Sequence, residues 1–400
     1  MKTLRRKTSR LGKVLLCRLL ILCTVILTAT ACIGTRPRSA CVVPPTVPGV
    51  TNNRTFQVSV ADSVGGLITA PGPPRRRLDV LVLSGGGSWG AYGAGFINGW
   101  TKRAADTGIP RPQFDIVTGV STGAIIAPFA LLGPQWDGIL EGAYNGISSV
   151  DVLATRSILV LFSWNSLKDV EPLQSRLNAD LDAATLTALA RAAQEHRSVW
   201  VGATNADTGT FTRFDLTGIA LYQPLAEARK EIVDRILAAT AIPVFFPPRF
   251  IDGCMYVDGG VRENLFLAEI GDAIHSALGG VRELDNATIN IYAVLNGPLT
   301  VSSRITQNTL LDVGERGFEL AANQIQLASL RETYDFAALN HYNFYWTSPD
   351  DLVSAVKEPG KCGPPPEAAD QFGSDFTACL FEAGRKKAAT AAAPWRNDRP

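Results

Sequence analysis

The chain has 400 residues, of which 46% are hydrophobic and 19% are charged. This composition excludes a disordered chain and supplies enough apolar side chains for one large α/β domain or two ordinary domains. The formal net charge is +1, but the first 31 residues hold seven of the 38 basic residues and no acidic one, so the remainder is mildly acidic. Because nucleic-acid binding needs clustered Lys and Arg side chains, we expect no nucleic-acid partner.

Residues 1–31 are expected to be a signal peptide. Basic residues run as far as Arg18, and the apolar stretch that follows is too short for the roughly 20 residues that cross a bilayer. Its end resembles the lipobox of bacterial lipoproteins, in which the cysteine after the cleavage site carries lipid, although Ala29 stands where that family prefers Leu. The resemblance implies export to the cell envelope and anchoring to a membrane surface through Cys32. Ordinary cleavage after Ala31 would instead give a periplasmic or secreted protein.

The rest of the chain divides into three regions. Residues 32–77 are rich in Pro, Gly, Thr and Ser and predict a tether. Residues 78–350 alternate apolar runs of strand length with helical stretches, which is typical of an α/β domain with a mostly parallel central sheet. Residues 351–400 are expected to form an irregular extension. The predicted strands are 78–84, 114–119, 198–204 and 287–295, with a hairpin arm at 210–216, and the predicted helices are 89–106, 122–132, 167–195, 223–241 and 305–331.

Seven cysteines and three histidines occur in the chain, and no C-x-x-C motif is present. This pattern predicts no metal site of ordinary Cys/His spacing. In an exported protein Cys362 and Cys379, which flank a Pro/Gly/acidic loop, could form a disulfide, and the sequence leaves open whether they do. Cys254 is expected to be a small buried residue.

The first candidate functional motif is the glycine-rich stretch 84–96, SGGGSWGAYGAGF, which directly follows the first predicted strand. Gly85, Gly87 and Gly90 match G-x-G-x-x-G, the pattern of a dinucleotide-binding turn, and Asp106 supplies an acid at a suitable distance. Any nest of backbone N–H groups at a helix N-terminus needs the same glycines, however. A P-loop is excluded because no G-K-[ST] follows.

The second motif is residues 119–123, GVSTG, which match G-x-S-x-G between an apolar strand and an apolar helix. A serine at such a sharp turn occupies strained backbone, so its neighbours two residues away on each side must be small. Ser121 is therefore a candidate nucleophile.

The third motif is Asp258-Gly259-Gly260, which follows a short predicted strand. Alone it would be an ordinary hairpin turn. Together with the other two motifs it supplies what an activated serine needs, namely a base and donors for an oxyanion. We expect Ser121 to be the nucleophile, Asp258 its base, and the backbone N–H groups of Gly85, Gly86, Gly87 and Ser88 the oxyanion hole.

These motifs, in this order, resemble those of the patatin-like phospholipases, and residues 202–216 and 238–265 are similar to that family's segments. The resemblance covers about residues 78–300. It implies a three-layer α/β/α fold, a Ser-Asp dyad that works without histidine, and hydrolysis of acyl esters of lipids or lysophospholipids with no metal or other cofactor. The assignments to Ser121, Asp258 and the nest match the family's motif positions.

One position departs from the family. The family often has a basic residue where this chain has Trp89, which puts a phospholipid preference in doubt. Trp89 and Tyr92 are expected to line an apolar mouth of the site, unless they pack in the core.

The residues leave three other functions to weigh. A hydrolase with a Ser-Asp-His triad would need His275 or His341, and a non-catalytic envelope lipoprotein would need none of these residues. A nucleotide-binding enzyme would leave the serine turn and the D-G-G unexplained. Head-group preference, acyl-chain preference and oligomeric state are not determined by the sequence.

Overall fold

The computed structural model describes residues 41, 77–147, 154–155, 168–267, 288–301, 303–354, 358–364, 373–390 and 392–400. The predicted signal peptide, Cys32 and His275 lie outside the described residues, as does most of the predicted tether. Within the described parts of the chain, none of the helices combines the length and apolar content needed to cross a lipid bilayer.

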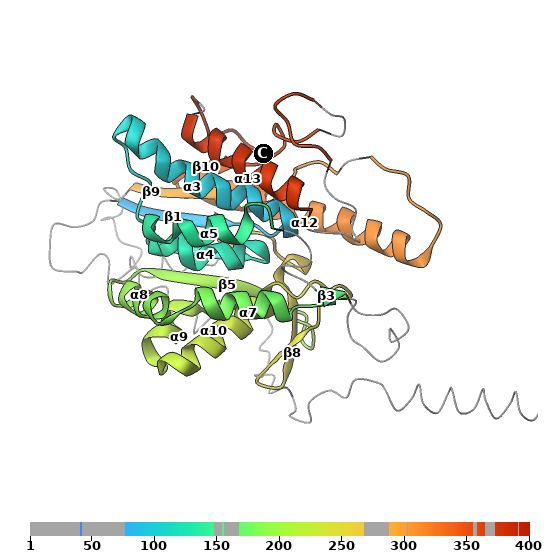
Figure 1. Cartoon of the computed structure of the whole chain (residues 1–400), viewed down its shortest axis with the longest axis horizontal. Coiled ribbons are helices and arrows are strands. Elements are labelled where there is room, and N and C mark those ends of the chain that lie inside the picture. Colours follow the sequence, from blue (N-terminus) through green and yellow to red (C-terminus); the bar gives the residue numbers. More distant parts are fainter. Residues whose placement is uncertain are drawn as a thin grey trace, which may run out of the picture.

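A mixed sheet organises the domain (Figure 1). Its strand order is β10-β9-β1-β2-β5-β8-β7, with β6 also paired to β5. The strands from β10 to β5 are parallel, while β6, β7 and β8 join by antiparallel pairing. The expected mostly parallel α/β sheet is therefore confirmed. The strands are β1 (Arg77–Leu83), β2 (Ile116–Val120), β5 (Ser198–Asn205), β6 (Thr210–Asp215), β7 (Arg249–Ile251), β8 (Cys254–Asp258), β9 (Thr288–Val294) and β10 (Asn343–Thr347), and a separate pair is β3 (Ala154–Thr155) and β4 (Lys168–Asp169).

Helices cover both faces of this sheet. The helices are α3 (Gly90–Thr107), α4 (Thr122–Leu132), α5 (Asp137–Tyr144), α7 (Glu171–Asp180), α8 (Ala183–Gln194), α9 (Leu216–Tyr222), α10 (Leu225–Ala239), α12 (Leu310–Leu339) and α13 (Ser374–Thr390). Short 3₁₀ turns are η1 (Gly87–Trp89), η2 (Pro134–Trp136) and η4 (Gly259–Val261).

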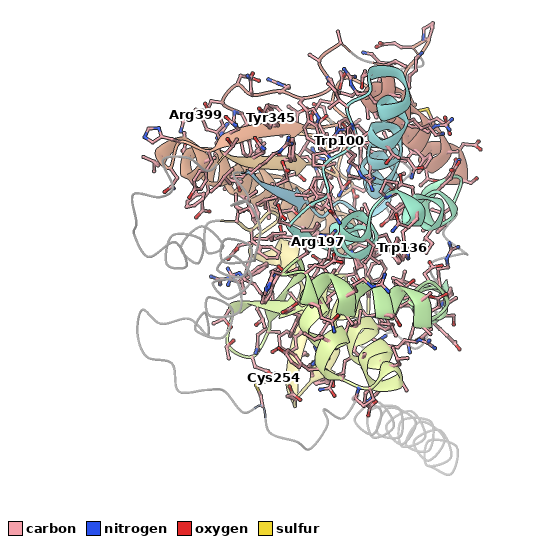
Figure 2. The ribbon with its side chains drawn as sticks, turned by 90° about the vertical axis from the view of Figure 1, so that its left-hand side faces the viewer. Trp100, Trp136, Arg197, Cys254, Tyr345 and Arg399 are labelled. Carbon is pink, nitrogen blue, oxygen red and sulfur yellow. A yellow bond between two sulfur atoms is a disulfide. The ribbon has the colours of Figure 1, made fainter. Side chains whose placement is uncertain are left out.

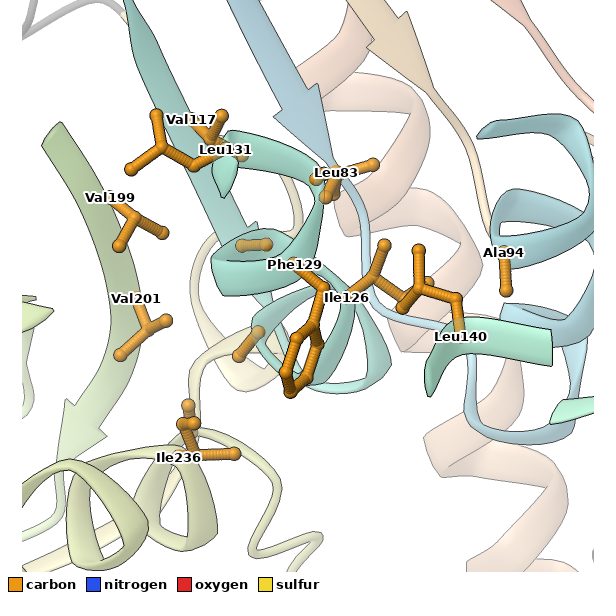
Figure 3. Close-up of a cluster of buried hydrophobic side chains, with 14 of the residues drawn as sticks. Leu83, Ala94, Val117, Ile126, Phe129, Leu131, Leu140, Val199, Val201 and Ile236 are labelled. Carbon is orange, nitrogen blue, oxygen red and sulfur yellow. The ribbon is translucent and has the colours of Figure 1, made fainter. Parts of the chain in front are cut away.

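The alternation of side chains along the strands produces two apolar cores. In β1, Leu81 and Leu83 face the core shared with α3, α4, α5, α7–α10 and α13, whereas Val80 and Val82 face the core shared with α12. Figure 3 shows part of the first core, in which Val117 of β2 lies beside Leu131 of α4. Since strands of a parallel sheet are buried on both faces, their near-continuous apolar sequence is explained.

The predicted helix 167–195 is two helices, α7 and α8. Leu181 lies between them and is fully buried, and the Asp182 side chain accepts a hydrogen bond from the Thr185 N–H at 2.8 Å as the N-cap of α8. An N-cap aspartate starts a new helix because it satisfies a free N–H. A second helix therefore begins at this cap, and the predicted helix does not continue through it.

The C-terminal region differs from the expected irregular extension because it contains α13. This helix packs against α3 so closely that backbone meets backbone: a Cβ on Gly95 would lie 2.0 Å from the Phe381 carbonyl oxygen, and one on Gly99 would lie 2.0 Å from that of Arg385. Gly95 of the glycine-rich stretch and Gly99 just beyond it thus serve helix packing. Phe381 is fully buried in this contact, which gives the Ala-rich tail an apolar face to bury.

Two disulfides join distant parts of the chain. Cys362 bonds to Cys379, as the flanking positions allowed. Cys254 is buried, as expected, and it forms a disulfide, which was not expected, with Cys41, 213 residues away in sequence. Cys254 lies at the end of the molecule opposite Tyr345 and Arg399 (Figure 2).

Candidate active site

Ser121 lies at the sharp turn between β2 and α4, the position that the G-x-S-x-G motif predicts. Its backbone has φ 52° and ψ −124°, and its N–H donates to the Ala239 carbonyl at 3.1 Å. A positive φ is unusual for a residue with a side chain and persists only where the surroundings hold it. The turn presents the hydroxyl of Ser121 at the N-terminus of α4, where free N–H groups favour negative charge.

The two glycines of this motif are required by close packing. A Cβ on Gly119 would lie 2.3 Å from the Gly123 carbonyl oxygen, and a Cβ on Gly123 would lie 2.5 Å from that of Leu83. Because both contacts are with backbone, a side chain at either position would push the turn apart. The spacing of the motif therefore follows from the geometry of the turn.

Asp258 is the last residue of β8, and the sheet brings it to Ser121. Strand β5 separates the two, with Gly202 paired to Val120 on one side and Ala203 paired to Asp258 on the other. The Asp258 N–H donates to the Ala241 carbonyl at 2.9 Å. Gly259 keeps this end of β8 close to β5, since a Cβ there would lie 2.4 Å from the Gly202 carbonyl oxygen.

The carboxyl group of Asp258 is buried, and burial raises its pKa to about 6. Interaction with the Ser121 hydroxyl and a hydrogen bond from the Gly260 N–H act in the opposite direction and lower the pKa. The Gly260 bond reaches Oδ1 at 2.7 Å, whereas the buried Oδ2 receives no hydrogen bond of ordinary geometry from the described residues. The geometry gives a carboxyl group whose pKa is close to neutral beside a serine hydroxyl, as general base catalysis requires.

The glycine nest lies against Ser121, but its members differ in role. A Cβ on Gly85 would lie 2.9 Å from the Ser121 Cβ, so the two backbones are in contact. The Gly85 N–H, however, donates to the Asn264 Oδ1 at 2.7 Å and is not available to a substrate. Gly87 has φ +58°, has open space around its Cα, and lines the pocket that contains Ser121.

An apolar pocket opens from Ser121 into the layer formed by α4, α5 and α7. Its empty space, including the open solvent at its mouth, is about 780 Å³. Its polar side chains are few: Thr122 and Tyr144 bond to each other at 2.6 Å, and Arg176 forms an ion pair with Asp180 at 2.6 Å. The described lining consists of Gly87, Ser121, Thr122, Ile125, Phe129, Leu140, Ala143, Tyr144, Ile147, Leu173, Arg176, Leu177, Asp180, Thr240, Ile242 and Phe246.

Trp89 and Tyr92, expected to line the mouth of the site, are not among these lining residues. Tyr92 is fully buried, and its hydroxyl bonds to the Thr347 hydroxyl. Trp89 packs edge-on against Phe376 of α13, with ring centroids 5.2 Å apart. Trp89 is thus partly buried against α13, the helix that the sequence did not predict, and Tyr92 packs in the core.

The two histidines in the described parts of the chain lie at the wrong edge of the sheet for a triad. Ser121 follows the carboxyl end of β2, whereas His196 and His341 precede the amino ends of β5 and β10. Because these strands are parallel, the two histidines lie at the edge of the sheet opposite Ser121.

The sequence reading missed three features of the site. Asn264 binds the Gly85 N–H, and the segment 239–242 after α10 holds the serine turn and contributes pocket residues. The ends of α5 and α7 supply much of the apolar lining. The short spacing from Asp258 to Asn264 was a possible signal for the first, but the others depend on how helices pack across the sheet.

Comparisons with known proteins found a similar family and similar chains. Residues 81–269 match the model of the patatin-like phospholipase family, a range that includes both Ser121 and Asp258. A cGAMP-activated phospholipase of Pseudomonas aeruginosa (strain BWHPSA011 / Pa011) is 27% identical over 245 residues, which cover 59% of this chain and 66% of that protein, just under two thirds of its length. The crystal structure of VipD from Legionella pneumophila matches with 14% identity and a TM-score of 0.33, covering 78% of this chain and 68% of that chain. Residues 81–269 therefore resemble a patatin-like phospholipase domain, a similarity that supports a lipid acyl hydrolase.

Proposed function

We propose that the protein is a serine hydrolase that cleaves carboxylic esters of lipids through an acyl-enzyme on Ser121. The observation that carries this proposal is the buried carboxyl group of Asp258 beside Ser121, at the mouth of an apolar pocket. A strained turn and a buried carboxyl group cost stability, and functional sites are where such costs are retained.

In the first step Asp258 accepts the hydroxyl proton of Ser121 as Oγ bonds to the ester carbonyl carbon. The carbonyl oxygen becomes an oxyanion, which the N–H groups of Gly86, Gly87 and Ser88 stabilise. Each such donor increases the rate roughly 10²–10³-fold. The tetrahedral intermediate then breaks its bond to the alcohol oxygen, which takes the proton from Asp258 and leaves.

In the second step Asp258 takes a proton from water as the water oxygen attacks the acyl carbon. The bond to Ser121 Oγ breaks, Oγ recovers the proton, and the fatty acid leaves. The described histidines lie at the opposite edge of the sheet, which supports a mechanism that uses only Ser121 and Asp258.

We propose that the acyl chain of the substrate occupies the pocket between α4, α5 and α7. The lining is almost entirely apolar from Ser121 to the ion pair of Arg176 and Asp180. An alkyl chain gains about 0.8 kcal/mol for each CH₂ group that it buries, whereas a charged head group would lose its hydration there. The head group is then expected to remain on the solvent side of Ser121.

We also propose that the protein is exported and acts in the cell envelope, anchored to a membrane surface through lipid on Cys32. Two disulfides support this location because such bonds persist in oxidising compartments. Incorporation of labelled fatty acid into the wild type and its loss in Cys32→Ser would test the anchor. Unlabelled wild type recovered from the medium would contradict it.

The activity is tested by measuring release of fatty acid from a panel of p-nitrophenyl esters, phospholipids and lysophospholipids. We expect turnover by the wild type and by His341→Ala, and none by Ser121→Ala. Absence of turnover on every acyl ester would favour a non-catalytic envelope protein. A loss of about 10³-fold or more in kcat for His341→Ala would favour a triad.

A further inference from the structure

We propose that Asn264 is a positioning residue for the oxyanion nest and that α12, which lies beyond the matched domain, holds it in place. This role presupposes the acyl hydrolase activity proposed above. Asn264 follows the Asp258 turn by six residues, is 7% exposed and bonds to the nest directly. It thereby links the base, the nest and a helix from a distant part of the chain.

Three groups of Asn264 form hydrogen bonds to the nest and to α12. Its side-chain oxygen accepts from the Gly85 N–H at 2.7 Å, and its side-chain amide donates to the Gln326 Oε1 at 3.1 Å. Its backbone N–H donates to the Ser329 hydroxyl at 3.2 Å. Gln326 and Ser329 are one turn apart on α12, so a single helix face fixes both the backbone and the side chain of Asn264.

Gln326 is in turn fixed by the segment that follows β9. Its side-chain amide donates to the carbonyl oxygens of Gly297 at 3.3 Å and Pro298 at 3.1 Å, and the residue is 4% exposed. These bonds set which end of the Gln326 amide faces Asn264, and therefore which end of Asn264 faces Gly85. The orientation of the chain of amides follows from the carbonyls at its far end.

The other side of the nest is held by Asn296, near the start of the same segment. Its N–H donates to the Ser84 hydroxyl at 2.7 Å and its side-chain amide donates to the Ser84 carbonyl at 2.6 Å. Gly86 lies directly against this residue, since a Cβ on Gly86 would overlap the Asn296 carbonyl oxygen. The nest is thus clamped on both flanks by buried amides.

The hydrogen bond from the Gly85 N–H to Asn264 has a consequence for catalysis. Asn264 consumes the N–H of Gly85 and thereby fixes the start of the nest, in which Gly87 lines the pocket that contains Ser121. Oxyanion donors act only if they already point at the developing charge, and a displacement of about 1 Å can cost about 10²-fold in rate. Hydrogen bonds between buried polar groups restrict the motion of the groups that they join, which suits this task.

The test compares Asn264→Ala with a matched control, Asn290→Ala. Asn290 is also buried, at 6% exposed, and its side-chain amide donates to Asp79 at 3.0 Å at the amino end of the sheet, far from Ser121 in the strand direction. Both variants lose a buried amide, so both are expected to lower the melting temperature. Only Asn264→Ala is expected to lower kcat, by about 10²-fold on p-nitrophenyl butyrate, with KM nearly unchanged.

A tetrahedral inhibitor separates positioning from general destabilisation. An alkyl trifluoromethyl ketone forms a covalent adduct that places an oxyanion in the nest, so its inhibition constant should rise in Asn264→Ala by a factor similar to the loss in kcat. A merely structural role would leave this constant equal to that of Asn290→Ala. If Asn264→Ala does not fold, the same measurements on Gln326→Ala test the positioning role. We expect Gln326→Ala to lower kcat by a smaller factor than that predicted for Asn264→Ala.

Equal kcat values for Asn264→Ala and Asn290→Ala, or an unchanged kcat in Gln326→Ala where that variant decides, would overturn the positioning role while leaving the proposed function intact. A wild type without turnover on any ester would instead refute the proposed function. The two failures are therefore distinguishable in one set of measurements.

Discussion

The backbone N–H groups of Ser121 and Asp258 donate to two carbonyl oxygens only two residues apart. Ser121 bonds to Ala239 at 3.1 Å and Asp258 bonds to Ala241 at 2.9 Å. The proposed nucleophile and base, 137 positions apart in the sequence, are thus held by one short segment at the end of α10. Their separation depends on this segment as well as on the sheet, which keeps the dyad geometry rigid.

Activity should rise with pH through about 6. Burial raises the pKa of Asp258 to about 6, and only the ionised carboxylate can accept the proton of Ser121. We therefore expect kcat/KM to increase between about pH 5 and 7 and to level above that range. Initial rates on a neutral ester in buffers of constant ionic strength would check this. A profile that stays flat from pH 4.5 to 8 would show that Asp258 is not the base.

Asp258→Asn should abolish turnover without reducing stability at pH 8. Because the pKa in the folded protein lies above the ordinary value, the carboxyl group stabilises the fold at low pH, and this contribution is lost as the pH rises through about 4 to 6. Asparagine carries no charge to bury, so its melting temperature at pH 8 should equal or exceed that of the wild type. The difference should narrow at pH 5. A variant less stable at pH 8 than at pH 5, relative to the wild type, would contradict the shift.

Ala143→Phe should shorten the acyl chain that the enzyme prefers. Ala143 lies on α5 and lines the pocket, so a phenyl ring there would fill space that we assign to the chain. Activity on p-nitrophenyl acetate should change little, while activity on long-chain esters should fall by roughly 10-fold or more. Ala184→Phe, on an exposed part of α8, is the control. An equal loss on short and long chains would place the acyl chain elsewhere.

The contact of α3 with α13 predicts opposite effects for two glycine substitutions. A Cβ on Gly95 would lie 2.0 Å from the Phe381 carbonyl oxygen, so Gly95→Ala should destabilise the fold by about 1–3 kcal/mol. Gly138 in α5 has open space at the same position, and Gly138→Ala should stabilise by roughly 0.5–1 kcal/mol because alanine favours helices. Urea denaturation measures both. A stabilising Gly95→Ala would mean that α13 does not pack as described.

Local motifs could be predicted from the sequence because their residues are neighbours in the chain. The G-x-S-x-G turn, the parallel strands and the D-G-G each depend on adjacent residues, and the structure places Ser121 and Asp258 together. Features that depend on residues far apart in the chain could not be predicted from the sequence. Cys41 and Cys254 lie 213 positions apart, and the role of Asn264 needs the positions of Gly85 and Gln326.

The predicted places of Trp89 and Tyr92 differed from the structure for the same reason. An aromatic side chain at a helix N-terminus can face a pocket or the core. Here Trp89 packs against Phe376 of α13, and Tyr92 is fully buried. The Ala-rich segment that forms this helix showed no strong apolar pattern. Its packing depends on Gly95 and Gly99 of α3, and Gly95 also belongs to the glycine-rich stretch, so that stretch contributes to both the nest and helix packing.

The central claim, that Ser121 is a nucleophile activated by Asp258, is tested most directly by a fluorophosphonate probe and peptide mass spectrometry. We expect one covalent adduct, on Ser121, in the wild type, strongly slowed labelling in Asp258→Asn, and none in Ser121→Ala. Labelling of another residue, or equal labelling rates in the wild type and Asp258→Asn, would contradict the account.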